Sequence, residues 1–401
     1  VALVCACVPY WLAHGETEQA RTWLQETQAT ASDLDDPHEH SWLWLRQGEL
    51  AQKQGQVRQA AACFQEGFRL SRDQPEAVLR AALLTGLAEV SCQRGQLLHA
   101  RIYGEEALLQ ARQIGRQDLL YRTLLSLSQT WYMQGDIRAA RTAIAEVLAG
   151  VEHASQAGVR CRALLHYGQL CEDSGDFPQA QTNYREALRL AKHKEDKDGV
   201  CAALIALSRG MLARRMTFDE QLRLQIKPDQ RELSRIRHLI EHARKVAKQL
   251  AHPGYLCRIL ILEGWLAHQL GDRMTMERAW SEALLLAHHL EEPLVASAAL
   301  LGLGEIAMQQ HQWQEATGHL VQAAALAGEG HPYRGWAELQ LAKIAVEQGH
   351  YQEACRQGQA AATTFTDIGF HLAPCVQLWV EYLPERGNLL NSEKDLCNEH
   401  V

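Results

Sequence analysis

The chain has 401 residues, of which 47% are hydrophobic and 22% are charged. Its 40 Lys and Arg against 48 Asp and Glu give a formal net charge of −8, which argues against a general nucleic-acid binder, although a local basic stripe is compatible with it. A chain of this length predicts two or three globular domains unless it is built from repeats, so repeats are the first pattern to examine.

The cysteines and the apolar segments indicate the compartment. The eleven cysteines are odd in number and scattered, no CxxC motif occurs, and most lie among apolar residues of expected helices. Unpaired buried thiols are typical of a reducing environment. No run of about 18 apolar residues indicates a membrane span, and the short apolar start lacks the basic residues of a signal peptide. The sequence therefore predicts a cytoplasmic protein without a membrane segment, and its start at Val1 indicates a piece of a longer protein.

A helix-ending position recurs every 40 residues through the first half of the chain and returns near its end. These turn positions are Gly15, Gly55, Gly95, Gly135, Gly175, Gly271, His311 and Gly349. Five residues after them lie Ala20, Ala60, Ala100, Ala140, Ala180, Met276, Ala316 and Ala354. Glycine reaches φ > 0 without a Cβ clash and so ends a helix, and small residues let two helices approach closely. The pattern predicts helical hairpins of two helices of about 15 residues each.

The segment that begins at Gly175 shows one complete unit of this pattern. Asp176 is expected to cap the second helix, and Pro178 stands early in it, where a missing N–H costs little. Ala180, Tyr184 and Ala187 follow at offsets of four and three, which places them on one helix face.

The sixth repeat carries an insertion. Its first helix fits residues 201–213 and its second fits 232–250, with extra residues at about 216–231 that include Phe218, Leu222, Leu224 and Ile226. Two interpretations remain open. The apolar residues close over a groove or dock on a partner, or the insertion is a surface loop or a helix extension.

These elements add up to one repeating architecture. Nine helical pairs are expected from Val1 to about Phe365, followed by a capping helix at roughly 371–382, and no alternating apolar run indicates a strand. One pair cannot bury both its faces, so neighbours stack into a right-handed superhelix with a concave side. We expect an all-α fold, an α-α superhelix forming a single solenoid over residues 1–383, and a polar tail over 384–401.

The repeat pattern resembles that of the tetratricopeptide (TPR) family over about nine-tenths of the chain. The 40-residue period exceeds the family's usual 34 residues and is similar to the long repeats of MalT-type bacterial regulators, where the repeats follow an ATPase of the STAND class. Similar repeats occur in scaffold proteins that bind G-protein regulators and in peptide-sensing regulators of Gram-positive bacteria. The resemblance implies a binding solenoid. The sequence shows neither a GxxxxGK[ST] phosphate loop nor a recognisable helix-turn-helix, so ATPase and DNA-binding activities are not expected of this chain.

No pattern in the sequence indicates catalysis or a metal site. His238 and His242 are four residues apart on an expected helix, but the Glu between them is misplaced for HExxH and basic neighbours favour a solvated surface. No Ser/His/Asp or Cys/His arrangement has a motif around it. We therefore expect no enzyme activity, no cofactor and no bound metal.

The resemblance also implies which residues line the concave face. In TPR proteins these are the second, fifth, ninth, twelfth and thirteenth residues of the first helix of each pair. Arginines take such positions in four successive repeats, beside an apolar stripe, and a guanidinium fork suits a carboxylate or phosphate. The alternative, that they pair with nearby Glu or Asp, remains open. The residues expected to bind a ligand are Trp42, Arg122, Gln129, Tyr132, Arg162, Gln169, Arg209, Arg258, Trp265, His268 and Trp336.

The predicted function is a non-catalytic protein- or peptide-binding module. It would be the sensor or interaction region of a larger bacterial signalling or transcription-regulatory protein, with a partner that carries acidic groups. Contact with nucleic acid or membrane is not expected. The alternative is a structural scaffold that mediates oligomerisation or multiprotein assembly and leaves the groove empty.

Overall fold

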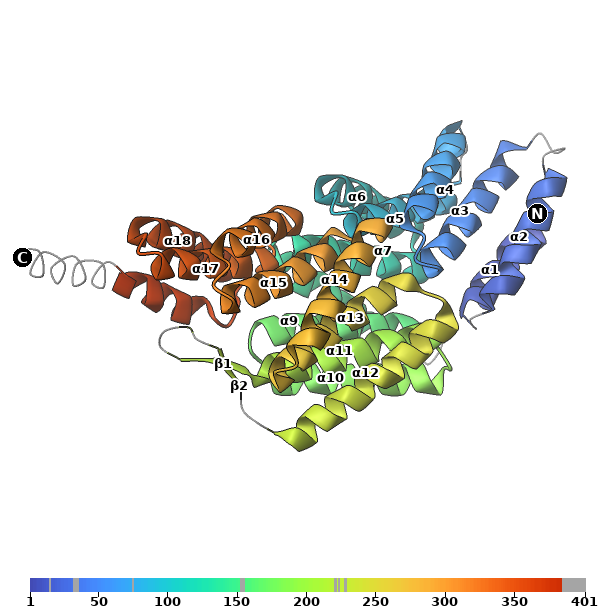
Figure 1. Ribbon diagram of the computed structural model, residues 1–401. Helices are drawn as coiled ribbons and strands as arrows, with labels where there is room; N and C mark the ends of the chain where they lie inside the picture. The colour runs from blue at the N-terminus through green and yellow to red at the C-terminus, as the bar shows by residue number, and fades with distance from the viewer. Residues whose placement is uncertain are drawn as a thin grey trace, which may run out of the picture.

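Helices make up nearly all of the molecule. The computed structural model describes residues 1–13, 16–31, 36–73, 76–151, 156–219, 222, 224–226 and 229–383. Within this part the helices form nine successive pairs, numbered here as repeats 1 to 9 (Figure 1). The first helices are α1 (Ala2–Ala13), α3 (Pro37–Lys53), α5 (Ala77–Gln93), α7 (Gln117–Met133), α9 (Ala157–Asp173), α11 (Lys197–Arg215), α13 (Pro253–Leu270), α15 (Pro293–Gln309) and α17 (Pro332–Glu347).

Each of these helices packs against a second helix that follows it in the chain. The second helices are α2 (Thr17–Ala31), α4 (Val57–Leu70), α6 (Leu97–Ile114), α8 (Ile137–Gly150), α10 (Phe177–His193), α12 (Gln230–Leu250), α14 (Arg273–Leu290), α16 (Trp313–Ala327) and α18 (Tyr351–Asp367). A short 3₁₀ helix, η1 (Ser71–Asp73), follows α4. Residues 373–383 are helical and cover the apolar end of α18, where a capping helix was expected.

The turns have the geometry that the 40-residue pattern predicts. Gly55, Gly95, Gly135 and Gly175 all have positive φ, and His311 adopts φ +59° where the pattern lacks glycine. Asp176 caps α10 by accepting a hydrogen bond from the amide of Gln179 at 3.1 Å, as expected. Local chemistry therefore sets where each helix ends and the next begins.

Glycines in the first helices make room for one large side chain in the second helix of each repeat. Trp280 of α14 is fully buried between Gly264 and Gly302, where an added Cβ would lie 2.1 and 2.3 Å from the indole ring. Phe64 and Tyr184 fill the same place in repeats 2 and 5 and are also fully buried. Each ring thus joins its own repeat to the next one, and a Cβ on either glycine would occupy its space.

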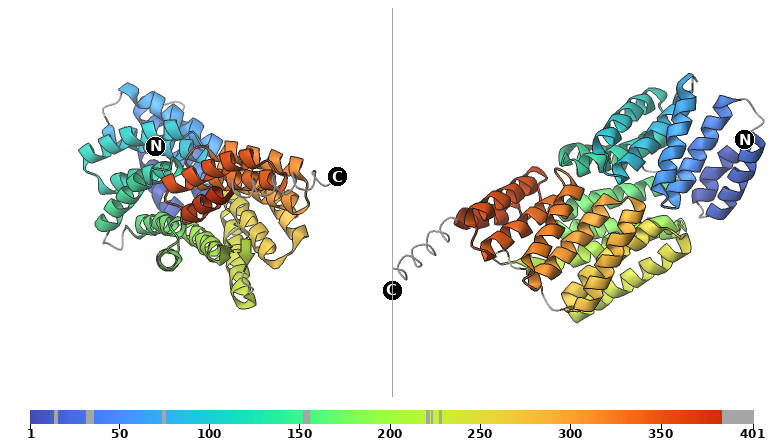
Figure 2. Two further views of the ribbon diagram at one scale, coloured as in Figure 1. Left: turned by 90° about the vertical axis from the view of Figure 1, so that its left-hand side faces the viewer. Right: turned by 45° about the horizontal axis from the view of Figure 1, so that its top comes forward.

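The pairs wind around a common axis until late repeats lie beside early ones (Figure 2). The backbone amide of His371 donates to the carbonyl of Asp173 at 2.9 Å, although 198 residues separate them. Gly55, Gly95 and Gly135 approach residues at the starts of α13, α15 and α17 in the same way. Lys53 of α3 forms an ion pair of 2.8 Å with Asp198 of α11. The superhelix therefore closes on itself after about five repeats.

The insertion of repeat 6 departs from the helical pattern. Strands β1 (Met216–Phe218) and β2 (Leu224–Ile226) pair antiparallel, with Met216 opposite Ile226 and Phe218 opposite Leu224. The expectation of a loop or a helix extension is therefore not met here, because a short β-hairpin connects α11 to α12. Leu222 is buried among residues of repeat 9, so the connection packs against the last repeat.

Candidate functional site

The inner wall of the superhelix is the candidate site, because the first helices of successive repeats line it. The expected ligand-binding residues all lie on these helices, from α3 to α17. Their surroundings differ widely, and three groups can be distinguished: arginines with internal partners, arginines exposed to solvent, and aromatic residues packed against the protein.

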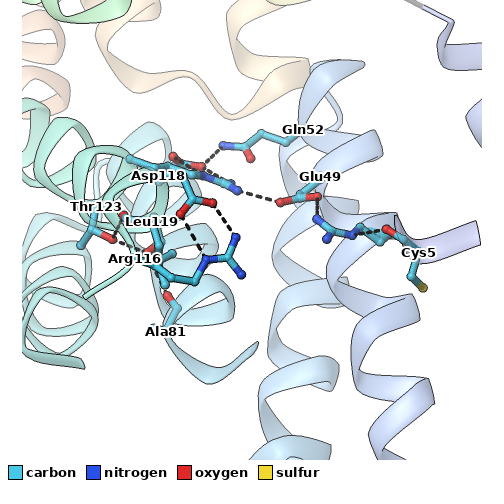
Figure 3. Close-up of polar contacts among 12 residues, drawn as sticks. Cys5, Glu49, Gln52, Ala81, Arg116, Asp118, Leu119 and Thr123 are labelled. Atoms are coloured by element: carbon cyan, nitrogen blue, oxygen red, sulfur yellow. Dashed lines mark hydrogen bonds and ion pairs between the residues drawn. The ribbon is translucent and has the colours of Figure 1, made fainter. Parts of the chain in front are cut away.

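Arg122 belongs to an ionic cluster near the N-terminal end, of which Figure 3 labels Glu49 and Gln52. Its guanidinium reaches Glu49 at 2.7 Å and Glu89 at 3.0 Å, and Arg46 also contacts Glu49 at 2.7 Å. Gln52 donates to Glu89 at 3.0 Å. Burial acts to raise the pKa of Glu89, but the charge and hydrogen bonds of Arg122 outweigh it, so the pKa of Glu89 is lowered. Arg122 is thus satisfied within the protein, as in the alternative that the sequence left open.

Arg209 is also paired, in a second cluster formed by α9, α10 and α11. Its guanidinium contacts Glu172 at 3.0 Å and the hydroxyl of Tyr184 at 2.9 Å, and this hydroxyl donates to Glu172 at 2.9 Å. Glu172 is only 7% exposed, so the three groups satisfy one another in a largely dry setting. Arg209 therefore links α11 to α9 and α10 in the inner wall.

Arg162 is different, because it is exposed and forms no ion pair with any described residue. In the repeat pattern the residue that corresponds to Glu89, the partner of Arg122, is the neutral Gln129. The charge of Arg162 nevertheless acts on a neighbouring side chain, since burial and this arginine together lower the pKa of His166 to about 4. Arg162 also acts on Glu89, since its charge is one of those that lower the pKa of that carboxyl, but it forms no direct ion pair in the described part of the chain.

Gln129, Tyr132 and Gln169 meet around a small cavity beside His166. The cavity measures about 10 Å³ and is also lined by Ser128, Ile144 and Leu170. This volume matches about one water molecule. The structure brings these three residues together, but they enclose too little space for a larger ligand in this conformation.

Asp173 lies next to Glu172 and provides a pH-sensitive group. Burial and the charge of Glu172 raise the pKa of Asp173 to about 7. A carboxyl with a folded-state pKa above its unfolded value near 3.9 binds its proton more tightly when folded, so its contribution to stability falls as pH rises from about 4 to 7.

We expect Asp173→Asn to remove this loss of stability between pH 4 and pH 7. At pH 8 the variant should exceed the wild type in unfolding free energy by roughly 1–2 kcal/mol, with allowance for the partial exposure of the side chain. The gain should shrink as pH approaches 4.5, which urea denaturation at several pH values will measure. The control is Asp118→Asn, because Arg116 lowers the pKa of Asp118 and no gain is expected there. Parallel stability profiles for Asp173→Asn and the wild type would contradict the assignment.

Arg258 is the second exposed arginine, with 48% of its side chain accessible. Its ion pair with Glu292 is long at 3.6 Å, and this carboxylate raises the pKa of Arg258. Tyr333 of α17 lies close enough to Arg258 and Arg209 for the charges of both arginines to act on its hydroxyl. Sequence reasoning missed Tyr333, because only the closure of the superhelix brings repeat 9 beside repeats 5 to 7.

The aromatic members of the expected set are mostly packed. Trp42 donates to Glu76 at 3.0 Å. Trp265 lies edge-on to Trp280 at 5.2 Å, and His268 is 7% exposed beside Glu305. These side chains are therefore packed within the inner wall, and little of their surface is free to contact a ligand.

Trp336 is covered by other aromatic rings. Phe218 of the hairpin lies 5.5 Å from it, and Phe365 and Phe370 lie at 5.7 and 6.1 Å. The expected apolar surface at this end of the wall is therefore occupied by the chain itself.

Two features of the described residues concern membranes and metals. No helix in that part of the chain is both long and apolar enough to cross a membrane. The same residues contain no group of three His, Cys, Asp or Glu placed to hold a metal ion.

Comparisons with known proteins agree with the repeat architecture. Residues 10–149 match the family model described as the MalT-like TPR region, and residues 162–194 match that of the tetratricopeptide repeat. No curated protein matches the sequence. In fold the chain is similar to a Rap protein solved in complex with competence and sporulation factor, with a TM-score of 0.67, 12% identity, and 92% of this chain and 98% of that chain covered.

A second solved structure, the apo form of RapI, is similar with a TM-score of 0.50 and 10% identity, covering 72% of this chain and 97% of that chain. At such identities these likenesses establish the fold alone. Residues 10–149 are therefore similar to the MalT-like TPR region, and residues 162–194 are similar to a tetratricopeptide repeat.

Proposed function

We propose that the chain is a non-catalytic module that binds a peptide or an extended segment of a partner protein on its inner wall. The ligand would carry carboxylates. The module would act as the sensor or interaction region of a larger bacterial regulator in the cytoplasm, where its unpaired buried cysteines stay reduced. The likeness in fold to a Rap protein holding competence and sporulation factor supports a binding role.

The exposed pair of arginines carries this proposal. Arg162 and Arg258 take the same position in repeats 5 and 7, and Ala202 takes it in repeat 6 between them. Arg162 forms no ion pair with any described residue, and the ion pair of Arg258 with Glu292 is long at 3.6 Å. Arg122 and Arg209 have their donors engaged, so an acidic ligand would find its counter-charge at Arg162 and Arg258.

A fluorescence anisotropy screen tests the proposal with labelled 12-residue peptides that carry either alternating Asp/Glu or alternating Lys. The acidic set should contain binders, and Arg162→Glu with Arg258→Glu should weaken them by about tenfold or more, as expected for two charge-assisted hydrogen-bonding sites. The matched control is Arg189→Glu with Arg356→Glu, which makes the same charge change at exposed positions of α10 and α18. Equal binding of both peptide sets, or equal losses in both double variants, would contradict the proposal.

A further inference from the structure

The β-hairpin of repeat 6 is held at its base by a buried arginine. Arg215, the last residue of α11, is 4% exposed and contacts Glu232 of α12 at 3.0 Å and Gln269 of α13 at 2.9 Å. Beyond this anchor, β1 and β2 pair only with each other in the described part of the chain. An isolated two-stranded hairpin is marginally stable in water, so this one depends on what it packs against.

The hairpin packs against the inner face of α17. Leu222 is 2% exposed within a cluster that contains Leu339 and Ala342, and Phe218 lies against Trp336 at 5.5 Å. Trp336 and Leu339 are the second and fifth positions at which the other first helices face the concave side. The hairpin therefore occupies a part of the inner wall where a ligand would be expected.

Polar contacts complete this arrangement. Lys343, at the ninth position of α17, donates to the backbone carbonyl of Leu222 at 2.7 Å and lies 5.9 Å from the ring of Phe218. Leu222 itself adopts φ +54°, in the left-handed region that β-carbon-bearing residues rarely enter. An extended peptide would be bound in the same way, with a side chain in an apolar site and a backbone carbonyl that accepts a hydrogen bond from an inward-facing cation.

We propose that the inner face of α17 is a docking site for an apolar partner segment with Phe-like and Leu-like side chains, and that the hairpin is an internal competitor for it. The partner would insert its two apolar side chains against Trp336 and Leu339 and present a carbonyl to Lys343. The hairpin would leave the site and lose its strand pairing as the partner enters. This inference extends the proposed function to repeat 9 and shares with it the premise that the inner wall binds partners.

The test uses a fluorescein-labelled peptide with the sequence of residues 214–229, added to the full chain. Wild-type protein should bind it weakly, because its own hairpin fills the site. In Phe218→Ala with Leu222→Ala the hairpin loses its two anchors, and this variant should bind the peptide at least about tenfold more tightly. Adding Trp336→Ala and Lys343→Ala should abolish the gain, and a peptide with alanine at both anchor positions should not bind.

A second measurement keeps the inference testable if that variant fails to fold by circular dichroism. Amide hydrogen exchange of the wild-type chain should show the amides of β1 and β2 exchanging at least about tenfold faster than those of α17, since hairpin release requires only local opening. A folded double variant that binds the peptide no better than wild type, or strand amides as protected as those of α17, would overturn the inference. The acidic-peptide screen involves repeats 5 and 7, so either proposal can fail without the other.

Discussion

Trp280→Ala is expected to lower the unfolding free energy of repeats 7 and 8 by about 3–5 kcal/mol, the range for removing a large buried aromatic side chain. The indole is fully buried in a gap formed by Gly264 and Gly302, which belong to two different first helices. Neither glycine has a side chain that could move into the vacated volume, so the cavity should persist. Because the ring joins adjacent repeats, its loss should weaken their interface as well as their interiors.

The measurement is urea denaturation together with hydrogen exchange, because a solenoid can unfold in parts. Amides of α13, α14 and α15 should lose protection, and those of α5 and α6 should keep theirs. The matched control is Met274→Ala on the same helix, whose side chain is 84% exposed and should change stability by no more than about 0.5 kcal/mol. Comparable losses for both variants, or a loss spread evenly over all repeats, would contradict this description of the packing.

The sequence predicts the repeat well because each feature of the pattern acts locally. Gly175 ends a helix, Asp176 caps the next one, and Tyr184 fills the gap beside Gly168, all within one unit. These constraints need no knowledge of distant residues. The helix boundaries and the order of the pairs follow from them.

The closure of the superhelix could not be predicted in the same way. The contact between Asp173 and His371 depends on a small rotation at every intervening repeat, and such rotations accumulate. Tyr333 therefore lies near Arg209 and Arg258 in the central part of the wall, although nothing in the sequence around these arginines indicates this proximity. The repeat period predicts that the chain forms a superhelix, but only the structure shows how many repeats make one turn of it.

The insertion shows a different limit. Phe218 and Leu222 were recognised as apolar residues that interrupt a regular array, and closure over the groove was one of two interpretations. Their destination, the inner face of α17, lies more than a hundred residues further along the chain, since 121 residues separate Leu222 from Lys343. A short strand pair also leaves little alternation to detect, because each strand has three residues.

The arginines of the inner wall show why a pattern of charges does not by itself define a ligand site. Arg122 and Arg162 occupy the same position in successive repeats, yet the first forms ion pairs with Glu49 and Glu89 and the second forms none with any described residue. The difference lies in the ninth positions, where Glu49 and Glu89 give way to Gln129. An arginine in such a solenoid is therefore available to a ligand only where the preceding repeats lack a carboxylate.

Arg122→Met is accordingly expected to destabilise the N-terminal repeats by about 2–4 kcal/mol at pH 7, somewhat below the range for breaking a fully buried ion pair because the site is partly exposed. Methionine keeps much of the arginine's apolar stem but leaves Glu49 and Glu89 near each other without their shared cation. Their side chains are only 13% and 15% exposed, so water compensates for the loss poorly.

The sign of the pH dependence follows from Glu89. Burial acts to raise the pKa of Glu89, but the charge and hydrogen bonds of Arg122 outweigh it and leave the pKa lowered in the folded chain. This carboxylate therefore contributes stability above its unfolded pKa near 4.3, and that contribution is lost as pH falls through the folded value. The variant lacks the contribution at every pH. The difference between wild type and variant should therefore be largest near pH 7 and shrink below about pH 4.

Thermal and urea unfolding at pH 7 and about pH 3 will measure this difference. Glu89→Gln in the Arg122→Met background should recover part of the loss at pH 7, because the amide carries no charge and Gln52 can still donate to its oxygen. Arg189→Met, which breaks an exposed pair with Glu186, should cost no more than about 0.5 kcal/mol. A loss that is equal at both pH values, or one that the glutamine does not reduce, would mean that Arg122 acts through its packing and not through its charge.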